Sequence, residues 1–124
     1  MQMGDIIEQD NRKFIFVCLD GEMEDGNSKR IMLNEDIEAA IFYIKGKYFA
    51  LNNECPHNHL RKIHNGFIAK HTVACPMHGW TYSLLTGENV KGGASLDPYI
   101  VEVIDGNVYI EVPDTKRPKW MDSY

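Results

Sequence analysis

Two short motifs, each with one cysteine and one histidine, constrain this 124-residue chain more than any other feature. The first is Cys55-Pro-His57 and the second is Cys75-Pro-Met-His78, and seventeen residues separate His57 from Cys75. Each motif supplies one thiolate and one imidazole, and both groups are common metal ligands. If both pairs serve one site, the fold must bring two separate loops face to face.

The matched pairs also indicate the kind of metal site. Two thiolates and two imidazoles are what a Rieske-type 2Fe–2S centre requires, because two histidines there replace two cysteines on one of the irons. Neutral imidazoles leave the site less negative than four thiolates would. Adding an electron therefore costs less electrostatic energy, and the reduction potential is higher. Such centres have potentials of roughly −150 to +300 mV, against about −400 mV for plant-type ferredoxins. The pattern therefore points to electron transfer.

A zinc site is the alternative reading of the same four residues. Two cysteines and two histidines suit tetrahedral Zn²⁺. Zinc fingers usually pair Cys with Cys and His with His, whereas both motifs here mix the two, and the spacing of Cys55 and His57 is unusually tight. A zinc-stabilised interaction module therefore stays open, and visible absorption of the purified protein separates it from an iron–sulfur protein.

Composition and charge narrow the class of protein further. The chain is 44% hydrophobic and 25% charged, which suits one globular domain. Its net charge of -5 argues against a nucleic-acid surface and favours a partner protein with a basic patch. The third cysteine, Cys18, leaves no second pair for a disulfide, which fits a reducing compartment. Without a signal peptide or an apolar run of ~20 residues, we expect a cytoplasmic monomer that binds no membrane.

Short apolar runs divided by turn signals predict an all-β fold of antiparallel strands. Residues 13–19 are expected to form a strand, with 28–33 returning beside it. Three pairs of runs around short polar turns predict hairpins: 40–44 with 48–51, 67–68 with 72–74, and 99–104 with 108–112. Apolar residues alternate in the last pair, which is the period of half-buried strands. Residues 113–124 contain two prolines and are expected to be irregular.

These loops and their surroundings resemble the Rieske ferredoxin family, whose cluster loops read C-x-H and C-x-x-H with about this separation. The run from Cys75 to Gly87 is similar to the family's second cluster loop and the turn after it. The resemblance extends roughly over residues 13–112. It implies a Rieske-like antiparallel β-sandwich with a cluster-binding subdomain formed by two loops. One domain would then cover residues 1–124, with its core at about 13–112 and an irregular tail at 113–124.

The resemblance also implies ligands and a function. Cys55 and Cys75 would bind the inner iron of one 2Fe–2S cluster, and His57 and His78 the outer, solvent-facing iron. The chain would be a stand-alone ferredoxin that passes single electrons from a flavin-dependent reductase to the terminal oxygenase of a Rieske-type dioxygenase system. We expect no catalytic residues, since no second domain exists for substrate chemistry. The alternative is the small subunit of a larger oxidoreductase, such as NADH-dependent nitrite reductase.

Three residues beside the motifs are candidates for roles next to the cluster. His59 stands where many family members have Gly, so it is either an exposed polar residue or a group on the cluster's rim. Trp80 replaces a Ser that donates to a sulfide in high-potential respiratory members, and we expect it to pack beneath its loop. Tyr82 matches a Tyr that donates to a Cys ligand in those members. Without the Ser donor, the resemblance implies a potential in the low part of the Rieske range.

Overall fold

The structure is a computed structural model, and it describes residues 2–56, 60–76 and 80–113. Regular structure in these residues is β-strand throughout, apart from one 3₁₀ turn, η1 (Ile63–Asn65). The strands in chain order are β1 (Ile6–Gln9), β2 (Arg12–Leu19), β3 (Ser28–Met32), β4 (Glu38–Ile44), β5 (Lys47–Asn52), β6 (Phe67–Ala69), β7 (Thr72–Ala74), β8 (Thr81–Ser83), β9 (Pro98–Tyr99), β10 (Val101–Ile104) and β11 (Asn107–Glu111). The predicted all-β fold is confirmed.

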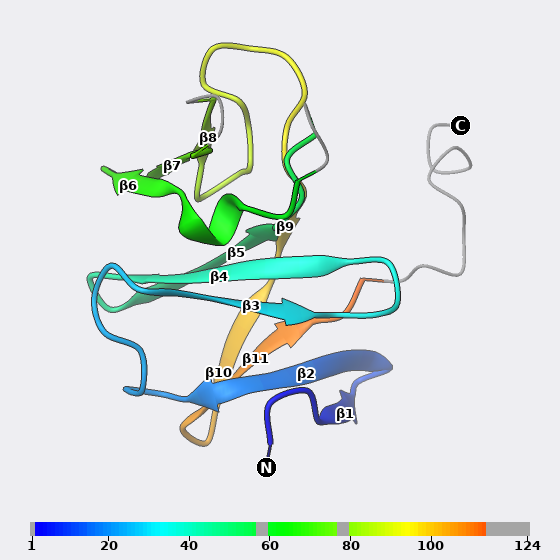
Figure 1. Cartoon of the computed structure of the whole chain (residues 1–124). Coiled ribbons are helices and arrows are strands. Elements are labelled where there is room, and N and C mark those ends of the chain that lie inside the picture. The colour runs from blue at the N-terminus through cyan, green and yellow to red at the C-terminus, as the bar shows by residue number, and fades with distance from the viewer. Residues whose placement is uncertain (1, 57–59, 77–79, 114–124) are drawn as a thin grey trace.

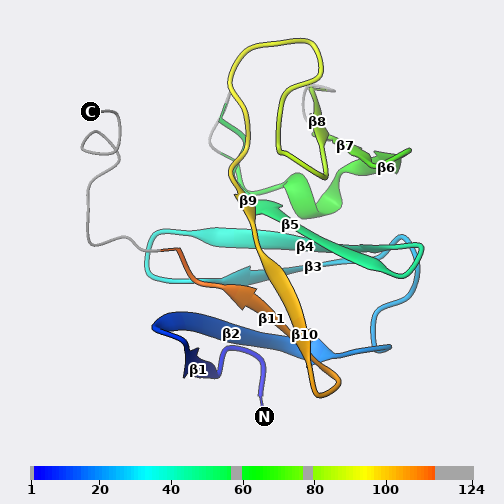
Figure 2. The same cartoon turned by 180° about the vertical axis from the view of Figure 1, so that it is seen from behind.

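The strands form three antiparallel sheets that lie as successive layers (Figure 1, Figure 2). The first sheet has the order β1-β2-β11-β10, and the second has the order β3-β4-β5-β9. The small sheet, β6-β7-β8, lies beyond the second sheet together with η1 (Figure 1). The chain thus builds a sandwich of two sheets and adds a subdomain on one outer face.

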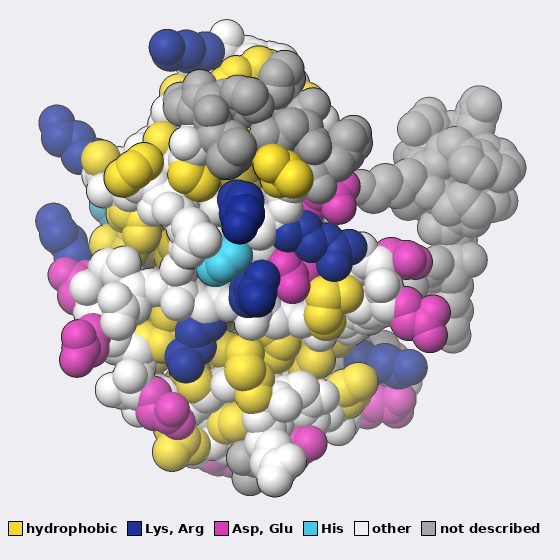
Figure 3. All heavy atoms as spheres, in the orientation of Figure 1, with side chains coloured by type: hydrophobic (Ala, Val, Ile, Leu, Met, Phe, Trp, Pro, Cys, Tyr) yellow, Lys and Arg dark blue, Asp and Glu magenta, His cyan; other side chains and the backbone are white. Residues whose placement is uncertain are grey.

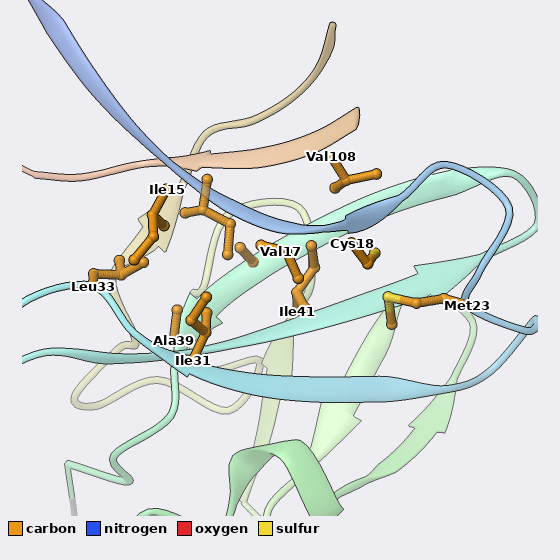
Figure 4. Packing of buried hydrophobic residues seen from close by; sticks show 11 residues of the cluster. Ile15, Val17, Cys18, Met23, Ile31, Leu33, Ala39, Ile41 and Val108 are labelled. Carbon is orange, nitrogen blue, oxygen red and sulfur yellow. The ribbon is translucent and has the colours of Figure 1, made fainter. Parts of the chain in front are cut away.

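The sandwich core lies between the first and second sheets. β4 supplies Ala39 and Ile41, and β2 faces them with Ile15 and Val17 (Figure 4). All four side chains are nearly or fully buried. Burying a side chain of the size of Ile or Val contributes about 1.5–3 kcal/mol, so this layer is a main source of stability.

A second core lies between the other face of the second sheet and the subdomain. Ala40 and Phe42 alternate along β4 with the residues of the sandwich core, as strand geometry requires. They pack with Leu51 of β5 against residues of the subdomain. Because β4 is buried on both faces, the subdomain packs on a well-ordered strand of the second sheet.

The strict alternation predicted for the last hairpin is absent. Val108, Tyr109 and Ile110 are all buried on β11, because the outer face of the first sheet is covered as well. There Tyr109 packs against Phe14 and Phe16 of β2 in a third, smaller core. A register shift between Val108 and Tyr109 accompanies this packing.

The predicted hairpins form with short turns. The turn Lys45-Gly46 joins β4 to β5, and Asp105-Gly106 joins β10 to β11. Lys45 and Asp105 have φ of 49° and 51°, which is the left-handed conformation that type I′ hairpin turns require. The hairpin of 67–68 with 72–74 is also confirmed, as β6 and β7.

Two strand predictions were wrong. Residues 28–33 do form a strand, but β3 pairs with β4 in the second sheet and does not return beside β2. Residues 99–104 are not one strand: β9 pairs with β5, while β10 pairs with β11 in the other sheet. The chain changes sheets at Ile100, whose side chain is 54% exposed. Of the predicted tail, residues 114–124 lie outside the described residues.

Candidate metal centre

Both motif cysteines stand at the start of loops with the same backbone closure. Cys55 follows the end of β5, and its N–H donates to the carbonyl of Leu60 at 2.9 Å. Cys75 follows β7 directly, and its N–H donates to the carbonyl of Trp80 at 2.7 Å. In each loop the hydrogen bond joins residue i to residue i+5. The two halves of the site are therefore built alike, as a centre bound by two matched loops requires.

The two thiols lie together in the second core. Cys55 and Cys75 are both 0% exposed, and both belong to the same cluster of buried residues. All three cysteines of the chain are free thiols. A pair of buried thiols beneath two loops is a soft donor set, and soft donors are what an iron–sulfide core binds. The described half of the site therefore fits an iron–sulfur cluster.

Gly66 holds the two loops close together. A Cβ atom at this position would lie 2.6 Å from the carbonyl oxygen of Ala74 and 2.5 Å from the side chain of Val73. Ala74 directly precedes Cys75, so the segment that returns from the first loop crosses β7 beside the second loop. Only glycine permits this approach without a shift of the backbone.

Tyr82 on β8 supplies a polar group to the sulfur of the first loop. Its side chain is 0% exposed, and its hydroxyl lies 3.7 Å from Sγ of Cys55. Burial, followed by the interaction with Cys55, raises the pKa of the Tyr82 hydroxyl above its ordinary value. The hydroxyl keeps its proton at neutral pH, so it can donate to a metal-bound thiolate.

A long loop, residues 84–97, connects β8 to β9 and forms part of the subdomain. Gly87 turns this loop with φ +79°, and its position leaves no room for a side chain beside the carbonyl of Leu96. Trp80 is half-buried and packs against the second core. A Cβ atom on Gly93 would lie 3.8 Å from the Trp80 ring, so the loop passes close to the indole.

The structure places part of the predicted site. Cys55, Cys75 and Tyr82 come together in the second core, with Trp80 at its edge. His57, His59 and His78 lie outside the described residues. Elsewhere in the described part of the chain, no group of three or more His, Cys, Asp or Glu side chains is arranged to hold a metal ion. Within residues 2–56, 60–76 and 80–113, no helix is long and apolar enough to cross a membrane.

Sequence reasoning missed two residues that shape the site. Asn53 is fully buried just before the first loop, and Gly66 contacts the strand before the second loop. A polar residue and a glycine in a loop are ordinary, so neither carried a signal of its own. Only the three-dimensional contacts reveal what they do.

The sandwich, the added subdomain and the paired cysteine loops define a β-protein with a metal site formed by two loops. Residues 13–102 match the family model described as the Rieske [2Fe-2S] domain. That range is well over half of the chain, so the chain belongs to this family. Its cofactor is a Rieske-type 2Fe–2S cluster.

A curated relative supports the same family. The chain is 35% identical over 103 residues to the 3-phenylpropionate/cinnamic acid dioxygenase ferredoxin subunit of Photorhabdus laumondii, covering 81% of this chain and 95% of the relative. The two chains therefore match over nearly all of the relative's length.

Solved structures share the fold. A chain in the complex of reduced oxygenase and oxidised ferredoxin of carbazole 1,9a-dioxygenase aligns with a TM-score of 0.71 at 24% identity, covering 77% of this chain and 98% of that chain. An NADH-dependent nitrite reductase small subunit from Mycobacterium tuberculosis aligns with a TM-score of 0.78 at 16% identity, covering 84% and 98%. At these identities the likeness concerns the fold alone.

Proposed function

We propose that this protein is a one-electron carrier, a Rieske ferredoxin that takes electrons from a flavin-dependent reductase and passes them to a Rieske-type oxygenase. The observation that carries the proposal is the pair of buried thiols, Cys55 and Cys75, at the start of two loops with the same closure. The similarity to a dioxygenase ferredoxin subunit over 95% of that relative supports the choice of partners.

We further propose that Cys55, His57, Cys75 and His78 hold the cluster. The burial of both thiols supports the cysteines as ligands of the inner iron. The matched motifs support the histidines as ligands of the outer iron, because each histidine follows its cysteine within one loop. When bound, the cluster accepts and releases one electron at a time. The protein's own residues shield the two cysteines from water, and the Tyr82 hydroxyl can donate to the Cys55 sulfur.

The same account assigns no substrate chemistry to the chain. The residues gathered at the site are thiols, a hydroxyl and packing groups, which suit electron storage and hydrogen bonding to sulfur. A cytoplasmic location is part of the proposal, since the three cysteines are free thiols and fit a reducing compartment. The nitrite reductase small subunit shares the fold at 16% identity, which adds nothing in favour of the alternative function.

The carrier role is tested by a coupled assay with NADH, the flavin-dependent reductase of a Rieske dioxygenase system, and cytochrome c as the final acceptor. We expect cytochrome c reduction to depend on both the reductase and this protein. The protein alone should not oxidise NADH. NADH oxidation by the protein alone, or no acceleration when it is added to the reductase, contradicts the carrier role.

The ligand assignment is tested separately by His57→Cys. A third thiolate makes the site more negative, so the variant should have a lower midpoint potential or lose the cluster. His71→Cys is the matched control, because His71 lies in the exposed turn between β6 and β7. An unchanged Rieske spectrum and potential in His57→Cys would remove His57 from the ligand set.

A further inference from the structure

The two cysteine loops are closed alike at the cysteine but are supported differently. The second loop joins two paired strands, because Ala74 of β7 lies opposite Thr81 of β8 at its base. The first loop follows β5, but its return segment, residues 60–65, is not part of any strand in the described structure. Besides the backbone hydrogen bond between Cys55 and Leu60, further interactions connect the two ends of the first loop.

The side chain of Asn53 makes that connection. It is 0% exposed and lies two residues before Cys55. Its Nδ2 donates to the carbonyl of Arg61 at 3.3 Å, and its Oδ1 accepts the backbone N–H of His64 at 2.7 Å. The carboxamide therefore bonds the segment entering the loop to the segment leaving it, as a pair of ladder hydrogen bonds does in a hairpin.

The same side chain fixes the loop to the sandwich. Nδ2 of Asn53 also donates to Oε1 of Glu38 on β4 at 2.6 Å. The Asn53 main chain repeats both connections, since its N–H donates to the carbonyl of Glu38 at 2.8 Å and its carbonyl accepts from the N–H of Ile63 at 3.3 Å. One buried residue thus joins three segments: β4, the start of the first loop and η1.

The surroundings of this residue hold it in one arrangement. The hydroxyl of Ser28 on β3 donates to the carbonyl of His64, which fixes η1 from the other side. Burial, followed by the nearby guanidinium of Arg30, lowers the pKa of His64 below its ordinary value. On one face of the molecule a histidine lies among Lys and Arg side chains, with an acidic side chain beside it (Figure 3).

We propose that Asn53 is a positioning residue: its buried carboxamide replaces strand pairing in the first loop and thereby sets the position of the Cys55 sulfur relative to the Tyr82 hydroxyl. This inference rests on the proposed role of Cys55 as a cluster ligand. Asn53 acts through the short stretch of chain between itself and Cys55.

The experiment is a double-mutant cycle between Asn53→Leu and Tyr82→Phe in the holoprotein, read by the midpoint potential and by EPR of the reduced state. Leucine has nearly the shape of asparagine but makes no hydrogen bonds. In the native background, Tyr82→Phe removes the donor to sulfur and lowers the midpoint. In the Asn53→Leu background that shift should fall to less than half, because the sulfur and the hydroxyl are no longer held together. The EPR lines of Asn53→Leu should also broaden.

Asn107→Leu is the matched control. Asn107 begins β11 at the far end of the sandwich, beside the turn to β10. The substitution is chemically the same, and Asn107 lies in the first sheet, on the opposite side of the second sheet from the subdomain. The effect of Tyr82→Phe should be full in this background.

A second pair of variants keeps the proposal testable if Asn53→Leu does not assemble a cluster. Asn53→Asp keeps the acceptor for the His64 N–H but sets a carboxylate against Glu38. Adding Glu38→Gln restores a donor opposite that carboxylate. We expect the single variant to lose the native coupling with Tyr82→Phe. The double variant should regain part of it, because an aspartate at position 53 still accepts from the His64 N–H but cannot donate to the carbonyl of Arg61.

The outcomes separate this inference from the proposed function. A native protein without a Rieske EPR signal contradicts the cluster and hence the proposed function. A native signal with a full Tyr82→Phe shift in Asn53→Leu overturns only the positioning role, because a residue that merely stabilises the fold leaves the shift unchanged. If Asn53→Leu lacks the cluster, recovery of coupling in the double variant supports the proposal, and absence of recovery overturns it.

Discussion

Replacing Tyr82 with Phe tests how the protein sets the potential of its cluster. The substitution removes one hydroxyl and keeps the ring that packs in the second core. Because the hydroxyl lies 3.7 Å from the Cys55 sulfur, it is placed to donate to that thiolate. Reduction makes the site more negative and strengthens such a bond, so the bond stabilises the reduced state. Its loss should therefore lower the midpoint potential.

The size of the shift follows from the geometry. A hydrogen bond contributes about 0.5–1.5 kcal/mol net, and a distance of 3.7 Å to a weak sulfur acceptor places this one in the lower half of that range. For a one-electron couple, about 1.4 kcal/mol corresponds to 59 mV. A differential of about 0.5–1 kcal/mol between the two redox states gives a decrease of roughly 20–40 mV.

The assay is a potentiometric titration of native and variant protein, monitored by EPR of the reduced state. Tyr109→Phe is the matched control, since Tyr109 is also buried, at 4% exposed, but packs with Phe16 on the outer face of the first sheet. The control should leave the midpoint unchanged. An unchanged midpoint in Tyr82→Phe, or an equal decrease in both variants, refutes the reasoning.

The remaining predictions concern stability. Gly87→Ala should destabilise the holoprotein by about 2–5 kcal/mol in urea unfolding, because the new Cβ meets the carbonyl oxygen of Leu96 at 1.9 Å in addition to the left-handed strain. Gly46→Ala has nothing within 4 Å of its Cβ and should lose only about 1–2 kcal/mol, so equal losses contradict the argument. Arg12 donates two hydrogen bonds to Glu111, at 2.9 and 2.8 Å, and lowers the pKa of that carboxyl below its ordinary value. Glu111→Gln should be less stable than the native protein at pH 7, and the difference should vanish as the pH falls below the lowered pKa; a difference that persists in acid contradicts it.

Local turn chemistry predicted hairpins well but did not predict which sheet a strand joins. The turn Asp105-Gly106 and the turn at Lys45-Gly46 were visible as short polar breaks, and both hairpins form. The turns between β2 and β3 carry similar residues, yet β3 crosses to the other sheet. A turn signal describes the local reversal of the chain, whereas the pairing partner depends on which apolar face must be buried.

Alternation failed as a guide where both faces of a strand are covered. β11 buries Val108, Tyr109 and Ile110 in succession, because a second layer of apolar residues lies on the outer face. At Ile100 the chain moves from one sheet to the other, so a run that alternates smoothly in sequence belongs to two sheets. Periodicity describes one strand and contains no information about how many layers the fold has.

The site itself was partly predictable for a chemical reason. Cysteine and histidine pairs are rare enough that their spacing identifies a metal site, and Cys55 and Cys75 do lie together in one buried cluster. The supporting residues were not predictable, because Asn53 and Gly66 act through contacts with segments distant in sequence. The types of ligand can be recognised from a short stretch of sequence, but their positions depend on the tertiary structure.

The central claim is that two buried thiols and two histidines hold a Rieske-type 2Fe–2S cluster. EPR of the dithionite-reduced protein, with iron, sulfide and zinc measured on the same sample, tests it most directly. We predict two irons and two sulfides per chain, a Rieske-type signal, and loss of the signal in both Cys55→Ser and Cys75→Ser but not in Cys18→Ser. One zinc per chain with no signal after reduction would contradict the account.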